Sequence, residues 1–339
     1  MQRDFSLVLP CGLVCLTGLW LYAPESLSLT QNELILLTRA QELIGGHALD
    51  LYNPLYLLLL GYWQQLASHP LLLRLPGLIC GLLAVVLSTR VLRMLIGAHA
   101  VPSALLLLAG APFFVAQIRA LTPAPLALVA TLLCSWVFLE YLRAGQRTWL
   151  GAWLITSILS WGIQAGLIFL ILVQGATMLL YRRRYSGYKE RRWWLAQIPV
   201  VAIFLLAFWQ PFSHFLSVRL PAFSFEQATG TIDLCARLST NLSLPQALPG
   251  MLVIILVALP SLRAADWRKD PRHGFLALSL LTPCLFYLCT SQSEALLLCA
   301  LPALSGLAAL GLRLYPRWAR QGLWSAVSLS YIWSYWHLY

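Results

Sequence analysis

The residues able to carry out acid–base chemistry gather in one stretch of the chain, residues 22–74. Four of the chain's 12 acidic residues and two of its 6 histidines lie there: Glu25, Glu33, Glu42, Asp50, His47 and His69. A carboxylate positioned beside a hydroxyl can act as a general base toward it. If the protein is an enzyme, a carboxylate of this stretch is the candidate general base, with Glu33 the first choice and Asp50 the second.

Histidine and cysteine give little support to a metal centre. The candidate ligands are His47, His69 and His214, and their spacing matches no metal-binding signature. The 8 cysteines include no C-x-x-C pair, and all but Cys235 fall in apolar segments, where cysteine behaves as a small hydrophobe. The sequence predicts no specific cofactor and leaves a divalent metal ion as an alternative.

Glu33 also has a purely structural interpretation. In the run Thr30-Gln31-Asn32-Glu33, the Thr30 hydroxyl and the Glu33 carboxylate can cap the free N–H groups of a helix start. A helix over Thr30–Ile44 would be about 22 Å long, shorter than the hydrocarbon core of a bilayer, and half of its surface is polar. We expect it to lie along the membrane surface, packed on the spans through Leu34, Ile35, Leu37 and Ile44.

The composition is that of an all-α integral membrane protein with several spans. Of the 339 residues, 60% are hydrophobic and only 10% are charged, and the mean hydropathy is +0.75, whereas a soluble domain carries about 25% charged residues. The net charge of +11 does not indicate nucleic-acid binding, because the basic residues form short clusters between apolar runs.

Apolar runs of the length of a span predict about eleven transmembrane helices. They are Phe5–Leu21, Leu75–Ile96, Val101–Gln117, Pro125–Leu142, Trp149–Gly162, Ala165–Tyr181, Trp193–Phe212, Leu248–Leu262, Gly274–Thr290, Ala295–Leu312 and Gly322–Leu338. We expect the first to be a retained span rather than a cleaved signal peptide. The short apolar run Asn53–Ala67 is predicted to be a second interfacial or re-entrant helix.

The basic residues set the predicted orientation. With two passes over Trp149–Tyr181, turning near Gln164, one side of the membrane keeps few of the 23 Lys and Arg residues: Arg39, Arg74, Arg119, Arg219 and Arg237. The positive-inside rule makes that side the outside. The N-terminus is then cytoplasmic, the C-terminus is outside, and the segments 22–74, 117–124 and 213–247 face outward.

Several short motifs follow one another in a recognisable order. They are Tyr52-Asn53-Pro54-Leu55-Tyr56, Leu73-Arg74-Leu75-Pro76-Gly77, Arg90-Val91-Leu92-Arg93, Ala111-Pro112-Phe113-Phe114 and Thr122-Pro123-Ala124-Pro125-Leu126. Over residues 1–185 this order resembles the GT-C-type glycosyltransferases of the lipid-linked-sugar class. The resemblance is to the protein O-mannosyltransferases and, more closely, to the bacterial aminoarabinose-to-lipid-A transferases.

The resemblance implies a GT-C-like module over residues 1–185, with surface helices in its outer loop 22–74. Beyond it the apolar pattern predicts further transmembrane helices over 186–339 and no separate soluble domain. The resemblance also implies transfer of a sugar from a polyprenyl-phosphate carrier to an acceptor on the outer face of a bacterial inner membrane. The bilayer and the carrier lipid are then partners, together with any membrane-protein partner, and nucleic acid is not. Substrate binding falls to Asn32, Tyr52, Tyr56, Arg74 and Arg119, with the two arginines suited to a phosphate.

The sequence departs from the family pattern at both acidic positions. The family has Asp-Glu in its first loop, where this chain has Asn32-Glu33, and an aspartate in the motif that here reads Thr122-Pro123-Ala124-Pro125. Because an amide cannot act as a general base near neutral pH, either Glu33 or Asp50 has taken over that role, or the chain is catalytically silent. The alternative function is thus a GT-C-fold scaffold or accessory subunit of a membrane complex, which the absence of a further domain after Tyr339 also favours.

The predicted orientation can be tested with an impermeant thiol reagent applied to intact cells. A cysteine introduced by Ser186→Cys, in a loop predicted to be cytoplasmic, should remain unlabelled until the membrane is permeabilised. The native Cys235, in the outer 213–247 segment, should react. Labelling of Ser186→Cys in intact cells, in a Cys235→Ser background, would overturn the eleven-span topology.

Overall fold

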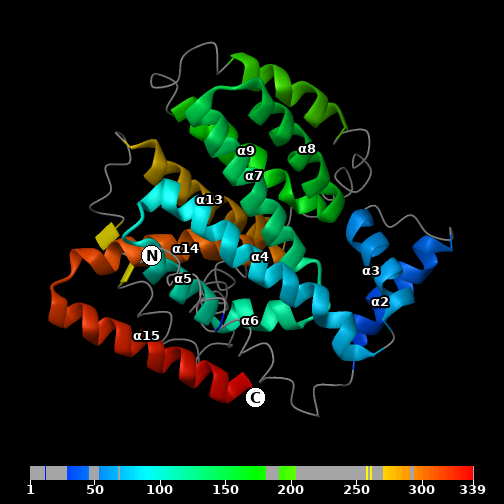
Figure 1. The fold of residues 1–339 in the computed structure, drawn as a ribbon, viewed down its shortest axis with the longest axis horizontal. Coiled ribbons are helices and arrows are strands. Elements are labelled where there is room, and N and C mark those ends of the chain that lie inside the picture. The colour runs from blue at the N-terminus through cyan, green and yellow to red at the C-terminus, as the bar shows by residue number, and fades with distance from the viewer. Residues whose placement is uncertain are drawn as a thin grey trace.

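The structure is a computed structural model, and it describes residues 29–45, 53–67, 69–180, 191–203, 270–290 and 294–338, with isolated positions at 12, 257–258 and 260–261. Within these ranges every regular element is a helix (Figure 1). The apolar helices identify a multi-pass membrane protein, as the composition predicts. The predicted spans Phe5–Leu21 and Leu248–Leu262, and the outer 213–247 segment, lie largely or entirely outside the described residues.

Two short helices, α2 (Gln31–Ile44) and α3 (Pro54–Leu66), pack against each other at one edge of the molecule (Figure 1). The predicted capping box at Thr30 is confirmed, since the Glu33 amide donates to the Thr30 hydroxyl and the Thr30 amide donates to the Glu33 carboxylate. The predicted packing face is wrong in part. Leu37 is buried, but Leu34 and Ile35 are about half exposed.

The physical reason for this correction is the polar residue that the helix buries. Glu33 is buried on the same face of α2 as Leu37 and Ala40, which follow it at i+4 and i+7. Leu34 and Ile35 directly follow Glu33 and are rotated away from that face. The ion pair of Glu33, described below, therefore fixes the rotation of α2 about its axis.

Two long helices, α4 (Pro70–Ile96) and α7 (Ala124–Ala144), pack against each other. Pro76 interrupts the hydrogen bonds of α4, because proline has no N–H to donate to the Leu72 carbonyl. The indole N–H of Trp63 in α3 donates to that carbonyl at 2.8 Å. The break in α4 is thus also a link between α3 and α4. Helix α7 ends at Ala144, and the next residue, Gly145, has a φ of 67°, a left-handed conformation that favours glycine.

A bent helix pair, α5 (Val101–Gly110) and α6 (Pro112–Arg119), follows α4, with an angle of 57° at the bend. Ala111 is extended, as the residue before a proline tends to be. The Leu107 and Gly110 carbonyls at the end of α5 accept hydrogen bonds from the hydroxyls of Tyr331 and Tyr335.

These two tyrosines stand one helical turn apart on the last helix, α15 (Arg317–Leu338). They therefore attach α15 to the end of α5. Carbonyl groups in the last turn of a helix have no N–H partner within the helix, and in an apolar environment they need another donor. The two tyrosine hydroxyls provide it.

A close approach between α4 and α6 is possible because residue 77 is glycine. A Cβ atom there would lie 2.5 Å from the Ile118 carbonyl oxygen. This contact places the end of α6, and the segment that follows it, beside the first turns of α4.

The chain over residues 149–181 breaks into two helices, as predicted. Helix α8 (Arg147–Ile163) ends before the extended residue Gln164, and a short turn η2 (Ala165–Ile168) leads into α9 (Phe169–Leu180). Helix α8 packs on α7, whereas α9 packs on α13 (Pro271–Thr290), which in turn packs on α14 (Glu294–Leu314). A buried hydrogen bond from the Trp153 indole to the Gln174 side-chain oxygen, 2.8 Å long, joins α8 to α9.

Three described helices are long and apolar enough to cross a membrane: Pro70–Ile96, Ala124–Ala144 and Leu296–Leu314. The bent α5–α6 pair makes a fourth if it is counted as one span. The structure thus supports the membrane class of the prediction. The count of eleven spans is not confirmed and stays a prediction.

The substitution Leu37→Asp should destabilise the α2–α3 unit. Leu37 is 5% exposed, and loss of its burial costs about 1.5–3 kcal/mol before the penalty for an unpaired buried charge is added. Thermal unfolding of the purified protein in detergent should show a lower midpoint. Thr38→Asp, at the exposed neighbouring position, is the matched control, and equal effects of the two substitutions would contradict the described packing of α2.

Candidate functional site

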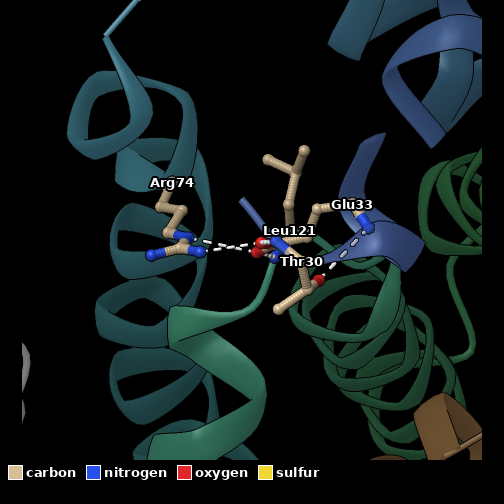
Figure 2. Close-up of polar contacts among 4 residues, drawn as sticks. All are labelled: Thr30, Glu33, Arg74 and Leu121. Atoms are coloured by element: carbon tan, nitrogen blue, oxygen red, sulfur yellow. Dashed lines mark hydrogen bonds and ion pairs between the residues drawn. The ribbon is translucent and has the colours of Figure 1, made fainter. Parts of the chain in front are cut away.

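The centre of the site is a buried ion pair between two residues that the sequence assigned to catalysis and to phosphate binding. Arg74, in the second turn of α4, donates from Nε to Glu33 Oε1 at 3.0 Å and from Nη2 to Glu33 Oε2 at 2.7 Å (Figure 2). Both side chains are less than one tenth exposed. This two-point geometry is the strongest that arginine makes with a carboxylate.

The carboxylate of Glu33 also accepts two backbone hydrogen bonds. The Leu121 amide donates to Oε1 at 2.9 Å, and the Thr30 amide donates to Oε2 at 2.9 Å (Figure 2). Each carboxylate oxygen therefore accepts two hydrogen bonds. The Glu33 side chain thus joins the start of α2 to two distant segments. Arg74, at the start of α4, is 41 residues from Glu33 along the chain, and Leu121, between α6 and α7, is 88 residues from it.

The hydrogen bonds determine the charge of Glu33. Burial raises the pKa of the Glu33 carboxyl, but the hydrogen bonds from Arg74, Thr30 and Leu121, together with the charge of Arg74, outweigh burial and hold this pKa below the usual 4.5. Glu33 is therefore an anion at neutral pH. A carboxylate with a lowered pKa and four donors is a weak base toward a hydroxyl.

A small hydrophobic core surrounds the ion pair. Its buried members come from α2, α3, the start of α4 and the segment after α6: Leu37, Ala40, Tyr56, Leu57, Leu60, Ala67, Leu73 and Leu121. This core excludes water from the pair, and in a medium of low polarity a charge persists only when it is paired and hydrogen-bonded.

A cavity of about 210 Å³ lies next to the ion pair, between α3, the first half of α4 and the start of α7. Arg74 and Tyr56 line it, and Trp63, Leu73, Pro125 and Leu126 contribute apolar walls. It combines a mostly apolar surface with one cationic side chain, an arrangement suited to an amphiphile with an anionic group. Burial, and after it the charge of Glu33, raises the pKa of the Tyr56 phenol, so Tyr56 stays neutral.

The structure brings together three of the predicted site residues, namely Glu33, Arg74 and Tyr56. Asn32 lies beside Glu33 on α2, but its side chain is exposed. Arg119 lies at the end of α6, two residues before Leu121, and it is not among the residues that line the cavity. The roles of Asn32 and Arg119 in substrate binding stay predictions. Asp50, Tyr52, His47 and His214 lie outside the described residues.

The described residues do not fit a metal site. No group of three or more His, Cys, Asp or Glu side chains comes together among them. His69 is exposed and caps α4, accepting a hydrogen bond at Nδ1 from the Leu71 amide. Both carboxylate oxygens of Glu33 accept hydrogen bonds from protein donors.

Two contacts at the site were not predicted from the sequence. The Leu121 amide donates to Glu33, and the Trp63 indole joins α3 to α4 close to the cavity. Backbone N–H groups carry no sequence signal. The only hint for Trp63 was Pro76, which leaves one carbonyl of α4 in need of a donor.

The sequence matches no protein-family model and no curated protein. The fold matches solved structures of GT-C glycosyltransferases. ArnT from Cupriavidus metallidurans, bound to undecaprenyl phosphate, matches with a TM-score of 0.60 and 18% identity, over 93% of this chain and 61% of that one. The arabinosyltransferase EmbB from Mycobacterium smegmatis matches with a TM-score of 0.56 and 19% identity, over 91% of this chain and 30% of that one.

The Archaeoglobus fulgidus oligosaccharyltransferase, in a complex with Zn and sulfate, matches with a TM-score of 0.57 and 14% identity, over 97% of this chain and 52% of that one. This chain thus spans about three fifths of the length of ArnT. At these identities the likeness concerns the fold, and the fold of this chain is GT-C. The resemblance inferred from the motif order is confirmed.

Removal of one partner of the buried ion pair should destabilise the protein by about 3–5 kcal/mol, because the other charge is left buried and unpaired. We expect Glu33→Leu and Arg74→Leu each to have this effect, and the double variant to lose less than the sum of the two. Glu42→Leu, at an exposed position of the same helix, is the control. Additive losses would show that the two residues do not act as a pair.

The same pair predicts a dependence of stability on pH. Because the pKa of Glu33 is lowered in the folded state, its contribution is fully present above the ordinary value of 4.5 and is lost as the pH falls through the lowered pKa. Thermal unfolding measured across the acid range should give a smaller acid-induced loss for Glu33→Gln than for the wild type. Identical profiles would contradict a lowered pKa.

Proposed function

We propose that this chain of GT-C fold binds a polyprenyl-phosphate-linked sugar and transfers the sugar to an acceptor on the non-cytoplasmic face of a bacterial inner membrane. The observation that carries the proposal is the mostly apolar cavity with Arg74 in its wall, beside the helix pair α2–α3. A prenyl chain needs an apolar surface and its phosphate needs a fixed cation, and the cavity offers both. The undecaprenyl phosphate bound to ArnT, a protein of similar fold, supports this ligand class.

In this proposal the ion pair positions the cation. Glu33 holds the guanidinium of Arg74 at the wall of the cavity through two hydrogen bonds. A cation held in place before the substrate binds can stabilise the negative charge that grows on the phosphate as the bond to the sugar breaks. Arg119, at the end of α6, is the second candidate for this charge. Tyr56, which lines the cavity, and Asn32 and Tyr52 are the proposed contacts to the sugar or carrier.

The general base is better assigned to Asp50 than to Glu33. Of the two predicted carboxylates, Glu33 already accepts hydrogen bonds from Arg74, Thr30 and Leu121, and its pKa is lowered. Deprotonation of an acceptor hydroxyl requires a carboxylate with a free lone pair near the sugar. Glu33 then acts as a positioning residue for Arg74, and Asp50 removes the proton.

A catalytically silent scaffold is the second candidate function, and one observation favours it. The family's first-loop aspartate is replaced by Asn32, and the neighbouring Glu33 is committed to a structural ion pair. Such a protein would keep the fold, and could keep the carrier site, without the base. The two functions differ in one measurable property, which is transfer of the sugar.

The test is transfer of a labelled sugar from polyprenyl phosphosugars in vesicles that contain the purified protein. Asp50→Asn should reduce the rate at least about 100-fold, the usual contribution of a general base. Glu33→Gln should weaken carrier binding, measured with undecaprenyl phosphate, together with the rate. Glu42→Gln is the matched control and should leave both unchanged.

Full activity in both Asp50→Asn and Glu33→Gln would refute the assignment of the carboxylates. Binding of undecaprenyl phosphate that depends on Arg74, without transfer by the wild type, would favour the scaffold. Binding that is unaffected by Arg74→Gln would refute the role of the cavity in either function.

A further inference from the structure

A second and larger cavity, of about 580 Å³, lies at the opposite ends of α4 and α7 from the cavity already described. It is bounded by the C-terminal turns of α4 and α7, by the first two turns of α13 and by Thr177 of α9. On α7, Leu126 lines the first cavity and Arg143 the second, and the rise of seventeen residues between them is about 25 Å along the helix axis. The same two helices therefore carry a cavity near each end, separated by roughly the thickness of a bilayer core.

Four arginines line this second cavity, namely Arg90, Arg93, Arg143 and Arg272, against a single carboxylate, Glu140. The Glu140 Oε2 atom lies 4.0 Å from the Arg143 Nη1 atom, a long distance for an ion pair. Within the described ranges, Arg90, Arg93 and Arg272 make no side-chain ion pair. The lining therefore has an excess of positive charge, contributed by three different helices.

The rest of the lining is apolar and partly aromatic. Met94, Trp136, Leu139, Leu142 and Phe275 form walls between the arginines. All four arginine side chains are exposed, so a ligand can reach them from outside the protein. Guanidinium groups match the oxygens of a phosphate, and the apolar walls match hydrocarbon chains.

We propose that this cavity binds the phosphate headgroup of an anionic phospholipid in the leaflet opposite to the transfer site, with its acyl chains along the apolar walls. Basic pockets between helices on the cytoplasmic side of membrane proteins are suited to such headgroups. The predicted orientation puts the ends of α4 and α7 on that side, where anionic lipid is attracted to basic residues. The site is separate from the carrier site, and it does not depend on whether the chain transfers a sugar.

The test compares two triple variants of the full chain in nanodiscs. Arg90→Gln/Arg93→Gln/Arg272→Gln removes three charges from the cavity, and Arg147→Gln/Arg313→Gln/Arg317→Gln removes three charges from exposed positions outside its lining. Retained cardiolipin and phosphatidylglycerol are counted by native mass spectrometry, with phosphatidylcholine as the neutral reference. The cavity variant should lose anionic lipid at least about tenfold, and the control variant less than twofold.

Two further measurements test the lipid site independently of the triple variants. Glu140→Gln removes the one acidic group of the described lining, so it should retain or increase bound anionic lipid, whether or not the triple variant folds. Inorganic phosphate at millimolar concentration should not displace the lipid. Equal losses in the two triple variants, reduced binding by a folded Glu140→Gln, or displacement by inorganic phosphate would each overturn the lipid site, the last by assigning the cavity to a free phosphate.

Discussion

The buried pair of Glu33 and Arg74 is the constraint on which the packing of α2, the start of α4 and the segment between α6 and α7 depends. A carboxylate and a guanidinium that are shielded from water remain charged only if they are paired and hydrogen-bonded, and this pair meets that condition with four donors to one carboxylate. Because Glu33 must be paired and hydrogen-bonded, the rotation of α2 about its axis is fixed. For the same reason the positions of the start of α4 and of the chain at Leu121 are fixed relative to α2. The carboxylate also holds a cation at the wall of an apolar cavity.

Prolines organise the helices around this site through the same rule of hydrogen-bond satisfaction. In an apolar environment a backbone carbonyl without its helical N–H needs another donor. Because Pro76 has no N–H, the Leu72 carbonyl accepts its hydrogen bond from the Trp63 indole. At the break before Pro112, carbonyls at the end of α5 accept hydrogen bonds from the hydroxyls of Tyr331 and Tyr335. Each interruption of a helix thus becomes a contact to a distant part of the chain, so that bends which would weaken an isolated helix help to assemble this fold.

The helices α4 and α7 carry two cavities that differ in chemistry. Near their first turns, a mostly apolar cavity contains one arginine held by a carboxylate, and near their last turns a larger cavity contains four arginines with one acidic residue. The first suits a carrier lipid whose phosphate must be held at one fixed point. The second suits a headgroup with more negative charge. Under the two proposals, this one helix pair contacts lipid phosphates in both leaflets.

The sequence by itself determined the membrane class, the two short helices α2 and α3 and the capping box at Thr30, because these features follow from local hydropathy, helix-stop residues and capping chemistry. The break near Gln164 followed from the distribution of basic residues between the apolar segments. The order of the motifs also identified the GT-C fold. Only the tertiary structure decided that Glu33 and Arg74, assigned separately to base and phosphate contact, bind each other, and that Leu34 and Ile35 lie outside the packed face. Contacts between residues 41 or 88 positions apart leave no periodic signal in one sequence. The capping motif at Thr30–Glu33 has the same sequence whether or not a distant arginine binds the glutamate.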